Sequence, residues 1–103
     1  MTDYKETSET VNRIKGKVED LLEQEIQSPY CNPIFGMQAR DPDAREHIIQ
    51  IGTSIISTRD GIGPPGGSFV QAIVDNDLMA AFGRADHINQ NSIYFYCKLM
   101  YNI

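Results

Sequence analysis

The chain has 103 residues, of which 41% are hydrophobic and 22% charged, and this composition is that of one small globular domain, not of a disordered chain. Its formal net charge is −5 and its pI is near 4.8. This acidic balance disfavours a polymeric nucleic-acid ligand, because DNA and RNA are bound by basic faces that release counterions, but it leaves room for a short anion at a local site.

The first predicted element is a helix over residues 7–27. Its apolar residues recur three or four positions apart and so share one side of a helix: Val11, Ile14, Val18, Leu21, Leu22 and Ile26. We expect Thr7 or Ser8 to cap it. The apolar stripe favours packing on the helix's own domain, and pairing with the same helix of a second subunit is the alternative.

Residues 28–43 differ in character from this helix. Pro29, Pro33 and Gly36 interrupt helical patterns, while Tyr30 and Phe35 are among the side chains too apolar for a free linker. We therefore predict an irregular connector packed over the core, ending near residue 40. The alternative is a boundary between a mobile N-terminal arm, residues 1–40, and a core domain, residues 41–103.

A helix is predicted from Asp41 to about Arg59. Asp41 followed by Pro42 is typical of an N-cap with proline at the first helical position, and Arg59 suits the C-terminal end of a helix. Ile48, Ile51 and neighbouring residues would be buried. Because residues 47–57 are rich in β-branched side chains, a strand is the alternative there.

Two further helices are predicted after a Gly/Pro-rich loop. Ser68 is the expected N-cap of a helix that runs to Phe82, with Gly83 at its end in a conformation of positive φ. Asp86 is expected to cap the final helix, which has a wide apolar face. Outside that face lie the aromatic residues Tyr94, Phe95 and Tyr101, whose exposure would indicate a partner surface.

These elements predict an all-α fold, a small helical bundle of three helices over residues 41–103 with an N-terminal helical arm. A chain this short buries more surface by self-association, so we also expect a homo-oligomer.

The segment "DGIGPPGGSF", residues 60–69, is the strongest candidate for a ligand site. It lacks the lysine of a phosphate-binding P-loop, and two prolines and the absence of a βαβ unit exclude a dinucleotide fingerprint. The backbone N–H groups of Gly66 and Gly67 and the hydroxyl of Ser68 precede a helix, where an anion is favoured, and Arg59 and Arg84 could supply charge. The alternative is a rigid corner.

Catalytic constellations are not apparent. His47 and His87 pair with no nucleophile in the sequence pattern, and no acidic pair has the histidine spacing of a metal site. Cys31 and Cys97 belong to no C-x-x-C pair and are expected to be free thiols in a reducing cytosol. We therefore predict no enzyme, no cofactor and no metal. The polar N-terminus and the lack of a long apolar segment predict a cytoplasmic protein with no membrane partner.

Residues 64–89, "PPGGSFVQAIVDNDLMAAFGRADHIN", resemble a family of small, mostly uncharacterised proteins of tailed bacteriophages and prophages. The resemblance rests on the prolines and glycines at its start and on Asn76-Asp77-Leu78, Arg84-Ala85-Asp86 and Asn89. It implies a phage protein that acts in the cytoplasm of an infected bacterium, and it brings no catalytic residue with it.

Three non-enzymatic roles fit this setting. The first is a sponge that sequesters a cyclic or ADP-ribose-type nucleotide signal of host defence, with the loop for phosphate and an aromatic ring for base stacking. Its ligand-binding residues would be Arg59, Gly66, Gly67, Ser68, Phe69, Arg84 and Tyr94. The second is an inhibitor that binds a host defence protein, for instance a CRISPR effector, through its acidic surface. The third is a structural or assembly protein.

Overall fold

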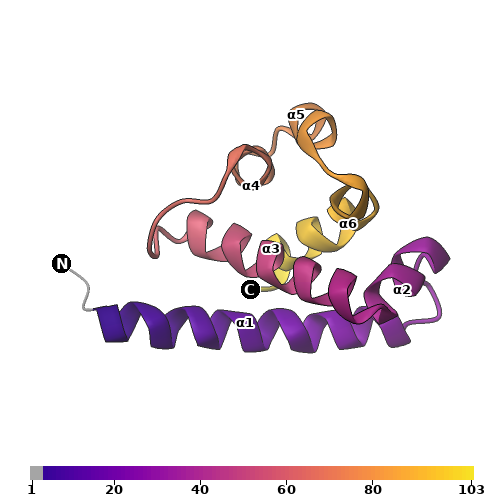
Figure 1. Cartoon of the computed structure of the whole chain (residues 1–103), viewed down its shortest axis with the longest axis horizontal. Coiled ribbons are helices and arrows are strands. Elements are labelled where there is room, and N and C mark those ends of the chain that lie inside the picture. Colours follow the sequence, from indigo (N-terminus) through magenta and orange to yellow (C-terminus); the bar gives the residue numbers. More distant parts are fainter. Residues whose placement is uncertain (1–3) are drawn as a thin grey trace.

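The computed structural model describes residues 4–103, with side chains from Thr7 onward. Within this range the chain forms six helices and no strand, which confirms the expected all-α class. They are α1 (Tyr4–Gln27), α2 (Pro33–Arg40), α3 (Pro42–Arg59), α4 (Ser68–Val74), α5 (Leu78–Arg84) and α6 (His87–Asn102). The long helix α1 lies along one side of the molecule, and α4 and α5 lie on the opposite side (Figure 1).

Helix α1 is part of the core and not a detached arm. Ile14, Val18 and Leu22, one turn apart, are buried in the same cluster as residues of α3 and α6. The prediction that α1 packs on its own domain is confirmed. The predicted cap is wrong, because the helix already includes Tyr4 and therefore contains Thr7 and Ser8.

The irregular connector predicted up to residue 40 is wrong for its second half, which is α2. Asn32 caps this helix, since its Oδ1 accepts hydrogen bonds from the N–H groups of Ile34 (2.9 Å) and Phe35 (3.2 Å). Pro33 is the first helical residue, where the missing N–H costs nothing. This Asn-Pro start repeats the Asp-Pro start that predicted the next helix.

Helix α3 is central and packs against α1, α2, α4 and α6. Asp41 caps it as predicted, with Oδ2 accepting a hydrogen bond from the Ala44 N–H at 3.0 Å. The strand alternative for residues 47–57 is wrong. The β-branched isoleucines of this segment stay helical because Ile48, Ile49, Ile55 and other α3 side chains are buried against the surrounding helices, and packing outweighs local propensity.

The single helix predicted from residue 68 to 82 is wrong, because the chain turns between α4 and α5. Asn76 has φ +59°, a left-handed conformation that asparagine tolerates better than most residues. Asp77 then caps α5, its Oδ1 accepting a hydrogen bond from the Ala80 N–H at 3.1 Å. Gly83 is inside α5 and does not have the predicted positive φ.

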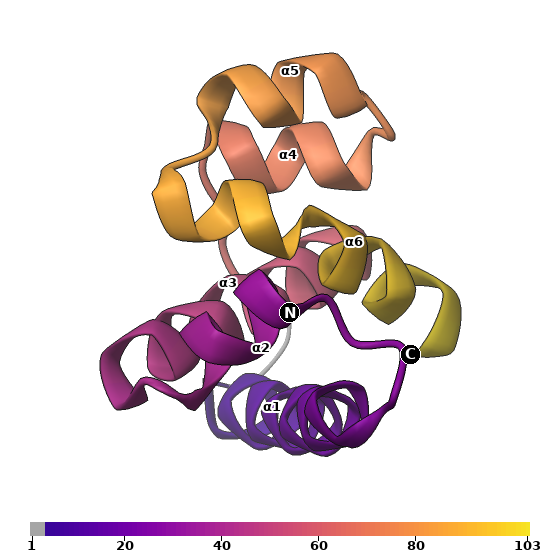
Figure 2. The same cartoon turned by 90° about the vertical axis from the view of Figure 1, so that its right-hand side faces the viewer.

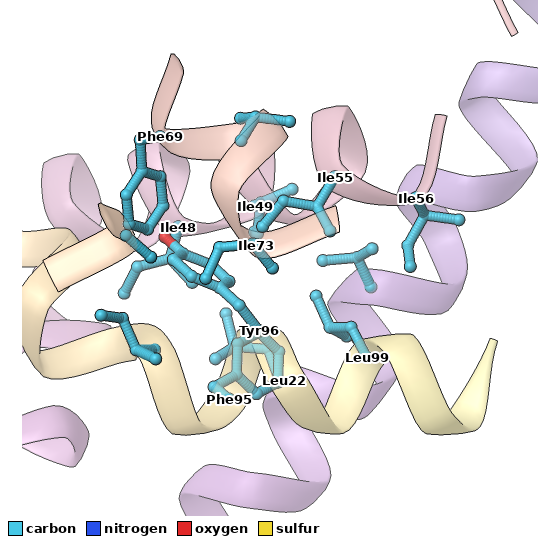
Figure 3. Packing of buried hydrophobic residues seen from close by; sticks show 14 of the residues in the cluster. Leu22, Ile48, Ile49, Ile55, Ile56, Phe69, Ile73, Phe95, Tyr96 and Leu99 are labelled. Atoms are coloured by element: carbon cyan, nitrogen blue, oxygen red, sulfur yellow. The ribbon is translucent and has the colours of Figure 1, made fainter. Parts of the chain in front are cut away.

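Helix α6 crosses the molecule between α1 and the α4–α5 pair (Figure 2). Tyr96 and Leu99 are fully buried, and Figure 3 shows them in the cluster with the isoleucines of α3. Phe95 is also buried, 5.5 Å from the ring of Phe35 between centroids, so its predicted exposure is wrong. Tyr94 and Tyr101 are exposed as predicted.

Candidate functional site

The loop between α3 and α4, residues 60–67, first serves to end α3. Its N–H groups return to the last turn of the helix, with Asp60 donating to the Ile56 carbonyl and Ile62 to the Ser57 carbonyl at 2.8 Å. Gly61 and Gly63 both have φ +69°, a conformation that favours glycine. These two glycines are therefore explained by the turn itself.

Gly66 holds the loop against α3. Its N–H donates to Thr58 Oγ1 at 2.9 Å, and its carbonyl accepts a hydrogen bond from Gln71 Nε2 at 2.8 Å. A Cβ at this position would lie 2.6 Å from Ser54 Oγ and 2.7 Å from Val70 Cγ1, so any larger residue would push the loop away. The Gly66 N–H predicted to meet an anion is already bonded within the protein.

The start of α4 differs from the prediction. Gly67 is the N-cap and Ser68 is the first helical residue, so the predicted Ser68 cap is wrong, and no side-chain hydrogen bond caps this helix. Phe69 is buried, with its ring edge-on to Tyr96 at 5.9 Å between centroids. It is therefore a core residue in this structure.

The two predicted arginines occupy different settings. Arg59 Nη1 and Nη2 donate to the carbonyls of Met100 (3.0 Å) and Ile103 (2.8 Å), and its Nε lies 2.9 Å from Asp60 Oδ1. That side chain holds the end of α6 and lowers the pKa of the Asp60 carboxyl by hydrogen bonding to it. Arg84 is exposed and lies 3.4 Å from the Ser68 carbonyl. Of the predicted side chains, Ser68 and Arg84 are the exposed ones at the start of α4.

Tyr94 lies away from the loop, in a different hollow. This hollow, of about 330 Å³, is bounded by the exposed rings of Tyr30 and Tyr94, and its further walls are Glu25, Asn32, Phe35, Asn91 and Phe95. We call it the tyrosine hollow. It lies at the end of the molecule that carries α2, whereas the α3–α4 loop lies at the other end (Figure 1). The predicted residues therefore do not converge on one site.

A second hollow, of about 250 Å³, shares wall residues with the tyrosine hollow and lies beside an ion pair between α1 and α6. Lys98 Nζ lies 2.8 Å from Glu25 Oε2, and Glu25 is buried although it is charged. The hydrogen bond to Glu25 is the main cause that raises the pKa of Lys98. Glu25 and Phe95 line both hollows, whereas Lys98 lines only the second.

Glu25 and Lys98 were not among the predicted site residues, and Tyr30, expected to pack over the core, is exposed instead. A signal was present for Glu25, because it continues the buried stripe of Ile14, Val18 and Leu22 at helical spacing. An acid in such a stripe predicts a buried partner. Nothing local indicated which cation would meet it, since Lys98 is 73 positions away in the chain.

The groups that usually carry catalysis have structural settings here. Among the described side chains, no three His, Cys, Asp or Glu residues gather closely enough to hold a metal ion. His47 Nε2 lies 3.0 Å from Asp86 Oδ2, a close contact without hydrogen-bond geometry that links α3 to the cap of α6. Burial raises the pKa of the Cys97 thiol, which disfavours the reactive thiolate.

None of the described helices combines the length and the apolar character needed to cross a bilayer. No family model, curated protein or solved structure matches this chain.

Proposed function

We propose that this protein is a non-enzymatic binding protein whose target is the surface of another protein. The observation that carries the proposal is a set of large apolar side chains exposed at one end of the molecule. They are Tyr30 (93% exposed), Ile34 (55%), Met37 (70%) and Tyr94 (69%). We call them the α2 patch. Singly exposed apolar residues are ordinary, but four of them on α2, just before it and on the adjacent α6 are typical of an interaction site.

The α2 patch stands on a rigid support. Phe35 and Ala39 on the inner side of α2 are buried, Phe35 against Phe95 of α6, while Ile34 and Met37 lie on its outer side one turn apart. Asn32 caps the helix at its start. Figure 2 looks onto this end, with α2 in front of α3 and between α1 and α6. A partner would therefore meet a preformed surface and pay little ordering entropy on binding.

The charge of the chain indicates the chemistry of the partner. With a net charge of −5, the protein attracts a basic surface and repels an acidic one. Complementary charge speeds the encounter, and apolar side chains at the centre of the contact then supply most of the affinity. We therefore propose a partner with a basic surface around an apolar contact.

The biological setting that we propose rests on the resemblance of residues 64–89 to phage proteins. In that setting, the partner is a host defence protein whose basic groove is occupied by this acidic protein. The sequestration of a nucleotide signal stays a prediction, and its residues Arg59, Gly66 and Phe69 are engaged within the fold.

The proposal is tested with the paired substitution Ile34→Glu and Met37→Glu, which places two charges on the outer side of α2. The matched control is Leu78→Glu and Met79→Glu, on exposed positions of α5. A partner purified with the wild-type chain is reconstituted from pure components and its binding is measured by calorimetry. We expect a loss of about 2 kcal/mol or more, roughly 30-fold in Kd, for the α2 pair only.

Two results would contradict the proposal. One is a partner that binds both paired variants as tightly as the wild type. The other is a melting-temperature rise with cyclic dinucleotides or ADP-ribose that the α2 pair leaves unchanged, which would favour nucleotide sequestration instead.

A further inference from the structure

We propose that the tyrosine hollow receives the guanidinium group of an arginine side chain presented by the partner protein. The inference rests on the proposed function, because the hollow opens between Tyr30 and Tyr94 of the α2 patch. The guanidinium would thus lie at the centre of the contact between this protein and its partner. Its volume of about 330 Å³ lies within the range of pockets that hold small ligand groups.

Among the described residues, the one charged side chain that lines this hollow is an acid. Glu25 is buried, and its Oε2 accepts the hydrogen bond from Lys98. Within the described part of the chain its second oxygen, Oε1, has no hydrogen-bond donor. The other polar walls are the amides of Asn32 and Asn91. The Asn32 carbonyl oxygen already accepts the N–H groups of Ile34 and Phe35, so the Asn91 carbonyl oxygen is the amide acceptor left for a ligand. A carboxylate oxygen and an amide oxygen favour a cation over a phosphate.

Lys98 already shows how a cation is held at this wall. Its Nζ lies 5.5 Å from the centroid of the Tyr94 ring and 2.8 Å from Glu25 Oε2. Lys98 lines the neighbouring hollow and not the tyrosine hollow. Because Lys98 already pairs with Oε2 of Glu25 and lies over the Tyr94 ring, a second cation in the tyrosine hollow would meet Oε1 of Glu25 and the ring of Tyr30.

A guanidinium fits this side better than an ammonium. It is planar and weakly hydrated, and it stacks on the face of an aromatic ring, of which Tyr30 and Tyr94 offer two. Its five N–H donors can also reach the carboxylate of Glu25 and the amide oxygen of Asn91 together, whereas an ammonium is a compact, strongly hydrated point charge. Stacking on a guanidinium would therefore give a role to Tyr30 and Tyr94, whose exposed rings are not part of the core.

The test uses ¹⁵N-labelled full-length protein titrated with Nα-acetyl-arginine amide. The matching citrulline and lysine amides and AMP are titrated separately. We expect saturable shift changes around residues 25–32 and 91–95, with arginine at least five-fold tighter than lysine and no saturation with citrulline or AMP. Absence of saturation with arginine, equal affinity for citrulline, or tighter binding of AMP would overturn the inference.

Variants locate the site. Tyr30→Ala and Tyr94→Ala remove exposed rings and leave the core intact, and each should weaken arginine binding at least five-fold. Tyr101→Ala is the matched control, since Tyr101 is another exposed tyrosine of α6 outside this hollow, and it should bind as the wild type does. Unchanged binding in both Tyr30→Ala and Tyr94→Ala would place the arginine elsewhere and refute the inference.

The two proposals fail in different ways. If arginine amide does not bind but the Ile34 and Met37 pair still abolishes partner binding, the hollow is wrong and the proposed function stands. If that pair leaves partner binding unchanged, the proposed function is wrong, and the arginine titration separately decides the chemistry of the hollow.

Discussion

Gly52 of α3 lies in close contact with both α1 and α6. A Cβ at this position would lie 2.8 Å from Leu99 Cδ1 of α6 and 3.0 Å from Val18 Cγ1 of α1, and both neighbours are fully buried. The glycine therefore sets the distance between α3 and its two partners. Gly16 in α1 is different, since a Cβ built there meets no described atom within 4 Å apart from its chain neighbours and the backbone of its own helix.

These two glycines should respond oppositely to alanine. Gly52→Ala overfills the contact and should lower the free energy of unfolding by about 1–3 kcal/mol, less the gain in helix propensity. Gly16→Ala adds only helix propensity and should raise it by about 0.5–1 kcal/mol. Urea unfolding followed by circular dichroism measures both. A stabilised Gly52→Ala variant would show that the three-helix contact is loose.

At the level of elements, two long-range contacts fasten α6 at its C-terminal half. Arg59 of α3 donates to the carbonyls of Met100 and Ile103, which lack partners within the helix. Lys98 bonds to Glu25 of α1. The first contact satisfies the helix end, and the second compensates a buried carboxylate, so that α1, α3 and α6 are tied by polar groups as well as by apolar packing.

The Lys98–Glu25 pair gives a pH dependence with a defined sign. The pKa of Lys98 is raised in the folded state, so the pair's contribution is fully present below the unfolded value of 10.5 and is lost as the pH rises through the folded pKa. The Lys98 side chain is partly exposed to solvent, which weakens its attraction to Glu25. Lys98→Met should therefore lower the free energy of unfolding by about 1 kcal/mol at pH 7.

That difference between wild type and variant should shrink between pH 10 and 12, as measured by urea unfolding at each pH. Comparing the two proteins removes the separate effect of Tyr96, whose phenol pKa is raised by burial and whose ionisation at high pH also favours unfolding. A difference that stays constant up to pH 12 would show that the ammonium of Lys98 does not stabilise the fold.

At the level of the whole molecule, the described residues share one apolar cluster that takes side chains from all six helices. The long axis is 43 Å and the other two are 27 and 24 Å, so most of the extension is α1 lying along the rest (Figure 1). The cluster joins residues 7–40 to residues 41–103, and both parts should therefore unfold together.

Leu22→Ala tests this cooperativity. Leu22 is fully buried in α1, and its truncation should cost about 2–5 kcal/mol. The unfolding midpoints seen for amides of α1 and of α4 by NMR should fall together. The exposed Met37→Ala variant is the control and should change stability by less than about 0.5 kcal/mol. Separate midpoints for the two helices would show that α1 is an independent arm.

Local signals account for much of the secondary structure. The Asp41-Pro42 start, the Asp86 cap and the apolar periodicity of α1 and α6 act within a few residues, and each predicted an element that the structure contains. The same kind of signal was available at Asn32-Pro33, and at Asp77 after the turn at Asn76. At both places the apolar residues around the turn and cap signals favour a different element from the one that those signals specify.

Contacts between residues far apart in the sequence decide the remaining features of the fold and of the candidate site. Arg59 and Phe69 looked free for a ligand, yet α6 engages the first and the core encloses the second. Tyr94 faces Tyr30 across one hollow, and Glu25 meets Lys98, although each pair is more than sixty positions apart in the sequence. Capping and periodicity depend on neighbours along the chain, so the residues alone reveal them. A site depends on which helix faces meet, and that follows from the packing of the complete core.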